Sequence, residues 1–233
     1  MTRDRGRGRP VPSLARSDQA PILLRASNIK VRIGSRTVLS GVDLKAETGR
    51  VLGVTGPAGS GKTTLLHVLA GIIGPSEGEV TVNGVSLAGR GRGALTSLGF
   101  VPQTFGLADA LSAAENVALP LQLMRLPRHE VAVRVESALA TLGLDNAGGQ
   151  LARDLSGGQQ QRTAVARAIV SEPRLIIADE PTSELDAASR DLVFALLRNA
   201  AEDGATVILS THDPDLVDGC DDVLSLQRGR AVE

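Results

Sequence analysis

The residues with the clearest chemical potential form a glycine-rich stretch, Gly56–Thr64, with the sequence GPAGSGKTT. An apolar run, Arg50–Thr55, precedes this stretch, and a helix-like run, Leu65–Ile72, follows it. A strand, a turn of the form Gly-x-x-x-x-Gly-Lys-Thr and a helix together predict a P-loop. The glycines let backbone N–H groups turn inward around an anion, and the start of the helix adds N–H groups without intrahelical partners.

Two side chains of this stretch add to the anion site. Lys62 can place its charge on the β- and γ-phosphates of a nucleotide, and the Thr63 hydroxyl can ligate Mg²⁺. The alternative is an ordinary glycine-rich turn before a helix. The chain has only three lysines, Lys30, Lys45 and Lys62, so a chance match to the whole pattern is rare. We therefore predict a nucleoside triphosphate site made by Gly56, Pro57, Ala58, Gly59, Ser60, Gly61, Lys62, Thr63 and Thr64.

Two carboxylates follow a second apolar run, Leu175–Ala178. That run is typical of a buried parallel strand, and ligands of open α/β sheets bind where such strands end. Asp179 suits a Mg²⁺ ligand, directly or through water, and Glu180 suits the activation of an attacking water. The alternative is a solvated acidic pair at the end of a strand.

His212 follows another buried-type run, Thr206–Ser210. At the end of a strand it could donate a hydrogen bond to a γ-phosphate or orient the water, although a lone histidine is more often structural. Ser156–Gln159 precedes a helical run in the same way that the P-loop does, with Gly157 and Gly158 exposing backbone N–H groups. This is a second anion-binding construction, and its alternative is a plain helix cap.

The elements around these residues indicate an α/β fold. Segments with alternating apolar residues over 22–46 and 78–84 predict an antiparallel sheet beside the P-loop core. Residues 112–143 carry apolar residues at helical spacing and predict a helical insertion, with a kink or break at Pro120. Residues 1–20 contain five Arg together with Gly, Pro and Ser, and predict a disordered tail.

The composition excludes several classes of function. A formal net charge of −1 and only three Phe, with no Trp or Tyr, give no reason to expect nucleic acid binding. The single Cys220 and three scattered His predict neither a disulfide framework nor a zinc cluster, and they fit a cytoplasmic protein. No apolar run approaches the roughly 20 residues that a membrane-spanning helix needs, so a membrane role would have to come through a partner.

Six motifs in order and spacing make residues 22–233 resemble the ATPase subunit of an ABC transporter. They are the Walker A loop GPAGSGKTT, a Q-loop Gln103, the signature LSGGQ from Leu155 to Gln159, Walker B LIIADE from Leu175 to Glu180, a D-loop Asp186, and a switch His212. The resemblance implies a P-loop NTPase with a RecA-like parallel core, an antiparallel β subdomain and a helical subdomain inserted at about 104–168. The domain would span 21–233.

The resemblance also implies a mechanism. Two subunits would form an ATP-dependent head-to-tail homodimer, with each ATP between the P-loop of one chain and Ser156, Gly157, Gly158 and Gln159 of the other. Glu180 would be the general base, His212 would contact the γ-phosphate, and Asp186 would lie near the nucleotide. Gln103 would ligate Mg²⁺ and link it to the helical subdomain, which docks on a separately encoded permease at the inner face of the membrane.

The segment from Leu111 to Leu121 is similar to the subgroup that serves macrolide-export and lipoprotein-release permeases. Two positions depart from the family pattern. Ile33 stands where the family usually has an aromatic residue stacked on adenine, and Glu184 stands in the D-loop where a small residue is usual. An aliphatic side chain covers the base without the stacking interaction.

The sequence is also compatible with other functions. The chief alternative is a regulatory or scaffolding ATP-binding module of the cell-division type, which acts through a membrane partner without transport. A soluble ABC ATPase of translation or DNA repair is disfavoured, because those proteins usually carry two such domains or a long coiled-coil insertion.

Overall fold

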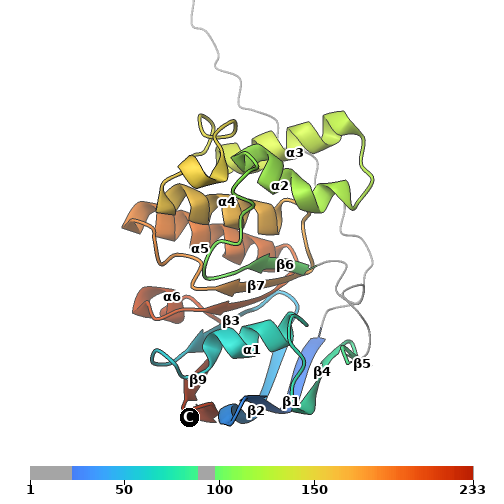
Figure 1. Ribbon diagram of the computed structural model, residues 1–233, viewed down its shortest axis with the longest axis vertical. Helices are drawn as coiled ribbons and strands as arrows, with labels where there is room; N and C mark the ends of the chain where they lie inside the picture. The colour runs from blue at the N-terminus through green and yellow to red at the C-terminus, as the bar shows by residue number, and fades with distance from the viewer. Residues whose placement is uncertain (1–22, 89–97, 233) are drawn as a thin grey trace, which may run out of the picture.

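The computed structural model describes residues 23–88 and 98–232, so the predicted tail at 1–20 lies outside the described residues. Two sheets and the helices around them make up this part of the chain (Figure 1). In chain order the elements are β1 Leu23–Ile33, β2 Arg36–Glu47, β3 Val51–Thr55, α1 Lys62–Leu69, β4 Glu77–Val82, β5 Val85–Ser86, β6 Leu98–Val101, α2 Ala113–Gln122, α3 Arg128–Thr141, η2 Ala152–Asp154, α4 Gly157–Ile169, β7 Leu175–Asp179, α5 Ala187–Glu202, β8 Thr206–Ser210, α6 Pro214–Asp218, β9 Asp222–Gln227 and β10 Arg230–Val232.

The core sheet has the order β10-β9-β3-β8-β7-β6. All its pairs are parallel except β10 with β9. Every residue of β7 and β8 is buried, as expected for strands covered on both faces. Alternate residues therefore enter two different cores: Ile177 and Ile208 pack with α1 and the antiparallel sheet, whereas Ile176 and Val207 pack with α4 and α5.

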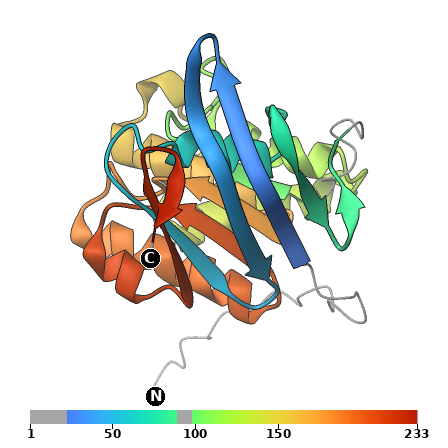
Figure 2. The same cartoon turned by 90° about the horizontal axis from the view of Figure 1, so that it is seen from below.

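The second sheet is antiparallel, with the order β2-β1-β4-β5. Figure 2 shows the long strands β1 and β2 crossing the core sheet, and the backbone N–H of Ser40 in β2 donates to the Gly229 carbonyl in the β9–β10 turn. A two-residue turn, Asn83-Gly84, joins β4 to β5 with positive φ at both residues, as a type I′ hairpin requires. The predicted antiparallel sheet is confirmed.

The helical part contains α2, α3 and α4 and covers one face of the core sheet (Figure 1). The Ser112 side chain and Glu115 form a capping box that starts α2. Of the predicted kink or break at Pro120, the break is wrong, because α2 continues through Pro120 to Gln122. Proline removes one hydrogen bond to the preceding turn, and the buried Leu121 holds the last turn against the core all the same.

Candidate active site

The predicted P-loop leaves β3 and enters α1, and its shape depends on glycines with positive φ. Gly56, Gly59 and Gly61 have φ of 138°, 74° and 109°. A Cβ on Gly56 would collide with the Leu226 carbonyl, and one on Gly61 would lie 2.8 Å from Leu39 Cδ2. No side chain caps the start of α1, which leaves the first N–H groups of the helix available to an anion in the loop.

The loop borders a cavity of about 540 Å³. The cavity lies at the edge of the core sheet where the carboxyl ends of β3, β7 and β6 meet the P-loop, and it gathers most of the residues that the sequence singles out. Its lining consists of Arg36, Val38, Gly56, Pro57, Ala58, Gly59, Ser60, Gly61, Lys62, Thr63, Thr64, Gln103, Asp179, Glu180, Ser183 and His212.

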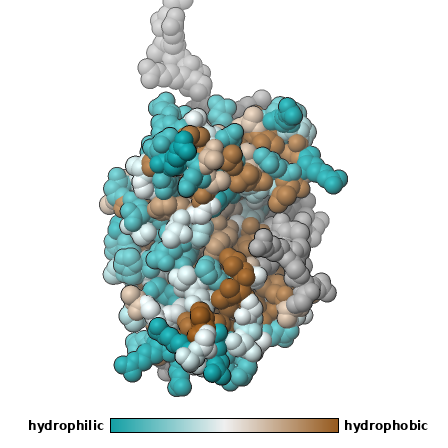
Figure 3. All heavy atoms as spheres, viewed as in Figure 1, coloured by the Kyte–Doolittle hydropathy of each residue, from teal (hydrophilic) through white to brown (hydrophobic). Residues whose placement is uncertain are grey.

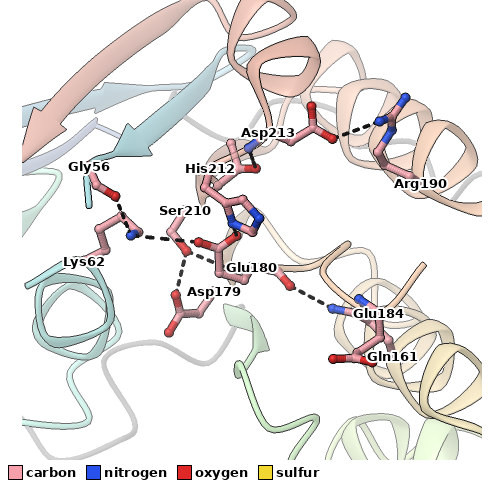
Figure 4. Close-up of polar contacts among 11 residues, drawn as sticks. Gly56, Lys62, Gln161, Asp179, Glu180, Glu184, Arg190, Ser210, His212 and Asp213 are labelled. Carbon is pink, nitrogen blue, oxygen red and sulfur yellow. Dashed lines mark hydrogen bonds and ion pairs between the residues drawn. The ribbon is translucent and has the colours of Figure 1, made fainter. Parts of the chain in front are cut away.

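Lys62 reaches back across the loop that precedes it. Its side chain is 12% exposed, its Nζ donates to the Gly56 carbonyl at 2.8 Å, and the same nitrogen lies 3.9 Å from Glu180 Oε1 (Figure 4). The ammonium group is therefore held between the backbone of the loop and the carboxylate at the end of β7. An anion in the loop would meet one localised positive charge there.

Asp179 and Glu180 are fixed by Ser210, at the end of β8. The Ser210 hydroxyl donates to Asp179 Oδ1 at 2.6 Å and accepts from the Glu180 N–H at 2.9 Å. Asp179 is 1% exposed, and its Oδ2 has no hydrogen-bond partner among the described residues. A buried carboxylate oxygen is costly without a partner, and an oxygen-ligated cation beside Thr63 would supply one. The donor set therefore fits Mg²⁺.

The Glu180 carboxylate lies between two nitrogen groups, Lys62 and His212. His212 Nδ1 is 3.0 Å from Glu180 Oε2, and the imidazole is 73% exposed, so its other edge faces solvent at the cavity (Figure 4). The next residue, Asp213, accepts from Arg190 of α5 at 3.0 Å. This pair joins the His212 turn to the helix that follows the D-loop.

Gln103 follows β6, is exposed, and lines the cavity. The turn after it is held by Arg167 of α4, which donates to the carbonyls of Gly106 and Phe105 at 2.5 and 2.8 Å. Burial lowers the pKa of the Arg167 guanidinium. The signature helix thus fixes the loop that carries Gln103, although Arg167 has no motif of its own and sequence reasoning missed it.

Ser156–Gln159 does not line this cavity. Ser156 Oγ accepts from the Gln159 N–H, and Gln159 Oε1 accepts from the Ser156 N–H, which makes a capping box at the start of α4. The helix-cap interpretation is thus correct for these two side chains, while Gly157 remains exposed beside them. Asp186 likewise caps α5 by accepting from the Ser189 N–H, which lowers the pKa of its carboxyl.

Ile33 also lies outside the lining of the cavity. It ends β1, is 60% exposed, and pairs with Arg36, which does line the cavity. A neighbouring cavity beside the P-loop is lined by Arg36 and Arg228. Sequence reasoning missed both arginines, since neither belongs to a motif and the turns that carry them come together only in the fold.

Replacing Ile33 with Tyr tests whether this position faces the base. We expect Ile33→Tyr to tighten ADP binding about 2- to 10-fold, since an aromatic pair adds about 0.5–1.5 kcal/mol to burial. Isothermal titration calorimetry with ADP measures this without turnover. Val85→Tyr is the control, because Val85 is also exposed on the antiparallel sheet and does not line the cavity. An equal ADP affinity in Ile33→Tyr and the parent chain would contradict the assignment of Ile33.

Comparison with known proteins agrees with this geometry. A family profile described as "ABC transporter" matches residues 39–183. The lipoprotein-releasing system ATP-binding protein LolD of Chromohalobacter salexigens is 42% identical over 203 residues, which cover 84% of this chain and 86% of that protein. The macrolide export ATP-binding/permease protein MacB of Rhodospirillum rubrum is 41% identical over 200 residues, or 84% of this chain and 31% of that protein.

A solved dimeric structure of MJ0796, described as a bacterial ABC transporter cassette, superposes with a TM-score of 0.85 at 31% identity, covering 90% of this chain and 97% of that chain. The fold and the matches define a P-loop ATPase with an α/β core, as predicted. The chain belongs to the ABC transporter family. It binds and hydrolyses ATP, and within the family it resembles the lipoprotein-release and macrolide-export subgroup, which confirms the resemblance drawn from the sequence.

Proposed function

We propose that the chain powers a separate membrane permease through ATP-driven closure of a head-to-tail homodimer, in a transporter of the lipoprotein-release or macrolide-export type. One observation carries this proposal: the chain has two constructions for binding an anion, and only the P-loop lines the cavity. Ser156–Gln159 is left for a nucleotide on another copy. The solved MJ0796 cassette, which is described as dimeric, supports the formation of a dimer.

Each half-site then holds ATP by its phosphates. The P-loop N–H groups and Lys62 bind the β- and γ-phosphates, and Ser156–Gln159 of the partner subunit closes on the γ-phosphate. Mg²⁺ would be held by Thr63, Gln103 and Asp179, where it would neutralise phosphate charge. The buried, unpartnered Oδ2 of Asp179 supports this donor set.

Hydrolysis rests on Glu180. Its carboxylate accepts a proton from the attacking water as the water oxygen bonds to the γ-phosphorus and the bond to the bridging oxygen breaks, which yields ADP and inorganic phosphate. His212 contacts the γ-phosphate with its exposed edge while Nδ1 keeps the Glu180 carboxylate in place. Loss of the γ-phosphate removes contacts that join the two subunits, so the dimer reopens.

The helical part offers a surface for a permease. Leu123 is 86% exposed directly after α2, and Met124 and Val133 are also exposed. Figure 3 shows apolar side chains gathered over α2 and α3. None of the helices over 23–88 and 98–232 has the length and apolar character of a membrane span. We propose that the apolar surface over α2 and α3 binds the permease, which holds the chain at the cytoplasmic face of the membrane.

Co-purification from detergent-solubilised membranes tests the proposed partner. We expect the tagged chain to retain a permease in mild detergent, and Leu123→Asp to release it while ATP hydrolysis by the isolated chain stays within about 2-fold, because a charge in an apolar interface is costly. Val223→Asp is the control, since Val223 is exposed on the C-terminal hairpin. Retention of a membrane protein without substrate-binding features would favour the scaffolding alternative instead.

A further inference from the structure

Gln161 is a buried amide that joins two functional segments. It lies in the first turns of α4 and is 1% exposed. Its Nε2 donates to the Glu180 carbonyl at 2.7 Å, and its Oε1 accepts from the Glu184 N–H at 2.7 Å. Figure 4 shows the side chain reaching from α4 to the segment between Glu180 and Glu184. One side chain therefore holds the backbone of the candidate base and of the D-loop.

The backbone of Glu180 needs such support. Its φ is 49°, in the left-handed region that residues with a Cβ occupy rarely. Ser210 binds its N–H through both the backbone carbonyl at 3.2 Å and the hydroxyl at 2.9 Å. Gln161 binds its carbonyl, which belongs to the next peptide group. The two partners together fix the direction in which the Glu180 carboxylate leaves the strand.

The two contacts need a side chain that both donates and accepts, and the glutamine amide does both. The Glu184 N–H is a donor and needs an acceptor, whereas the Glu180 carbonyl is an acceptor and needs a donor. An ionised carboxylate offers two acceptors, and a thioether offers no donor. The contact of Gln161 with the Glu180 carbonyl is buried and its contact with the Glu184 N–H is partly buried. A side chain that fails either group therefore leaves a polar group poorly satisfied.

The same helix starts at the second anion-binding construction. Ser156–Gln159 forms the start of α4, two residues before Gln161, and a Cβ on Gly158 would lie 3.2 Å from the Glu184 carbonyl. The D-loop thus packs on the start of the helix and is hydrogen-bonded to it at Gln161. A shift of α4 when the dimer closes would therefore move Gln161, which holds the Glu180 carbonyl.

We propose that Gln161 is a positioning residue for hydrolysis: it holds Glu180 in its active orientation from the helix whose start binds the other nucleotide of the dimer. Each chain contacts two nucleotides of the dimer, one with its P-loop and the other with Ser156–Gln159. Gln161 would thereby connect these two nucleotide sites within one chain. The proposal rests on the role of Glu180 proposed above. It assigns Gln161 no contact with the nucleotide.

Replacing Gln161 with Met keeps the length of the side chain and removes both hydrogen bonds. We expect kcat of Gln161→Met to fall about 10- to 100-fold, with KM and the ADP dissociation constant within about 3-fold of the parent values, since the P-loop is untouched. Gln161→Glu retains the acceptor for Glu184 but replaces the donor to Glu180 with a carboxylate oxygen that faces the Glu180 carbonyl, so we expect its kcat to fall by about 10-fold or more as well. It is also the second variant if Gln161→Met folds poorly.

Asn116→Leu is the matched control. Asn116 is a fully buried amide on α2 whose four hydrogen bonds all go to the backbone of residues 108–112, away from Glu180. We expect Asn116→Leu to lower the melting temperature as much as Gln161→Met does, while kcat per folded molecule stays within about 2-fold. The comparison separates a loss of stability from a loss of positioning.

The results distinguish this inference from the proposed function. A kcat within 3-fold of the parent value in Gln161→Met or Gln161→Glu, or a fall in Gln161→Met matched by Asn116→Leu, would overturn the role of Gln161. Glu180→Gln reports separately on the base. If that variant still hydrolyses ATP at the parent rate, the proposed role of Glu180 fails, whatever the Gln161 variants show.

Discussion

Glu180→Gln is expected to abolish ATP turnover, leave ATP binding intact and trap a closed dimer in Mg-ATP. The amide keeps the size of the side chain and can still contact His212, but it cannot accept the proton of the attacking water. Loss of a general base costs about 100- to 10,000-fold in rate. The closed state then persists, because the γ-phosphate that joins the two subunits is not removed.

Two measurements check this expectation. Phosphate release gives the rate, and size-exclusion chromatography with light scattering in Mg-ATP gives the mass. Glu202→Gln serves as the control, because Glu202 is exposed at the end of α5, and this variant should behave like the parent chain. A Glu180→Gln chain that binds ATP and yet elutes as a monomer would contradict the proposed ATP-dependent head-to-tail homodimer.

The second large effect is expected from Lys62→Ala, which removes the positive charge from the P-loop. Truncating one partner of a buried charge pair costs about 2–5 kcal/mol, so ATP binding should weaken about 30-fold or more. The cost is large here because the side chain is only 12% exposed and water screens it little. The Glu180 carboxylate also loses the ammonium that stands 3.9 Å away.

Titration with a fluorescent ATP analogue measures this change. Lys45→Ala is the matched control, because Lys45 is half exposed, pairs with Glu47 on β2 and does not line the cavity. Its affinity should equal that of the parent chain. An ATP affinity of Lys62→Ala within 2-fold of the parent value would refute the assignment of Gly56–Thr64 as the phosphate site.

Local signals made much of this fold and site predictable. The P-loop is a continuous segment whose glycines, lysine and flanking elements all predict the same structure. The Asn83-Gly84 turn is likewise predicted by two neighbouring residues. The residues that support the site act across the fold instead. Ser210 could have been suspected from its place at the end of a buried strand, but its bonds to Asp179 and Glu180 depend on β7 lying beside β8.

The roles of Gln161 and Arg36 could not be predicted from the sequence. Gln161 is the last of three consecutive glutamines, and it is the buried one. Its burial follows from the face of α4 that packs on the D-loop, which the sequence does not identify. Arg36 reaches the cavity because the β1–β2 hairpin folds over the P-loop, which no local pattern encodes. Pro120 shows the reverse case: proline locally disfavours the helix interior, but α2 continues through it, and the buried Leu121 packs that turn against the core.

The D-loop carboxylate of Glu184 has an energetic consequence for a cell. Its Oε2 would lie 3.5 Å from a Cβ on Gly157, so a negative charge stands at the helix start proposed to meet the γ-phosphate of a second copy. The Glu184 carboxylate and a phosphate bound at this helix start would repel each other, most strongly at low ionic strength. The repulsion would make closure of the free subunits weaker than the nucleotide contacts alone would make it, and a permease that holds two subunits side by side would offset part of this cost. ATP hydrolysis would then be faster in the assembled transporter than in the free subunits.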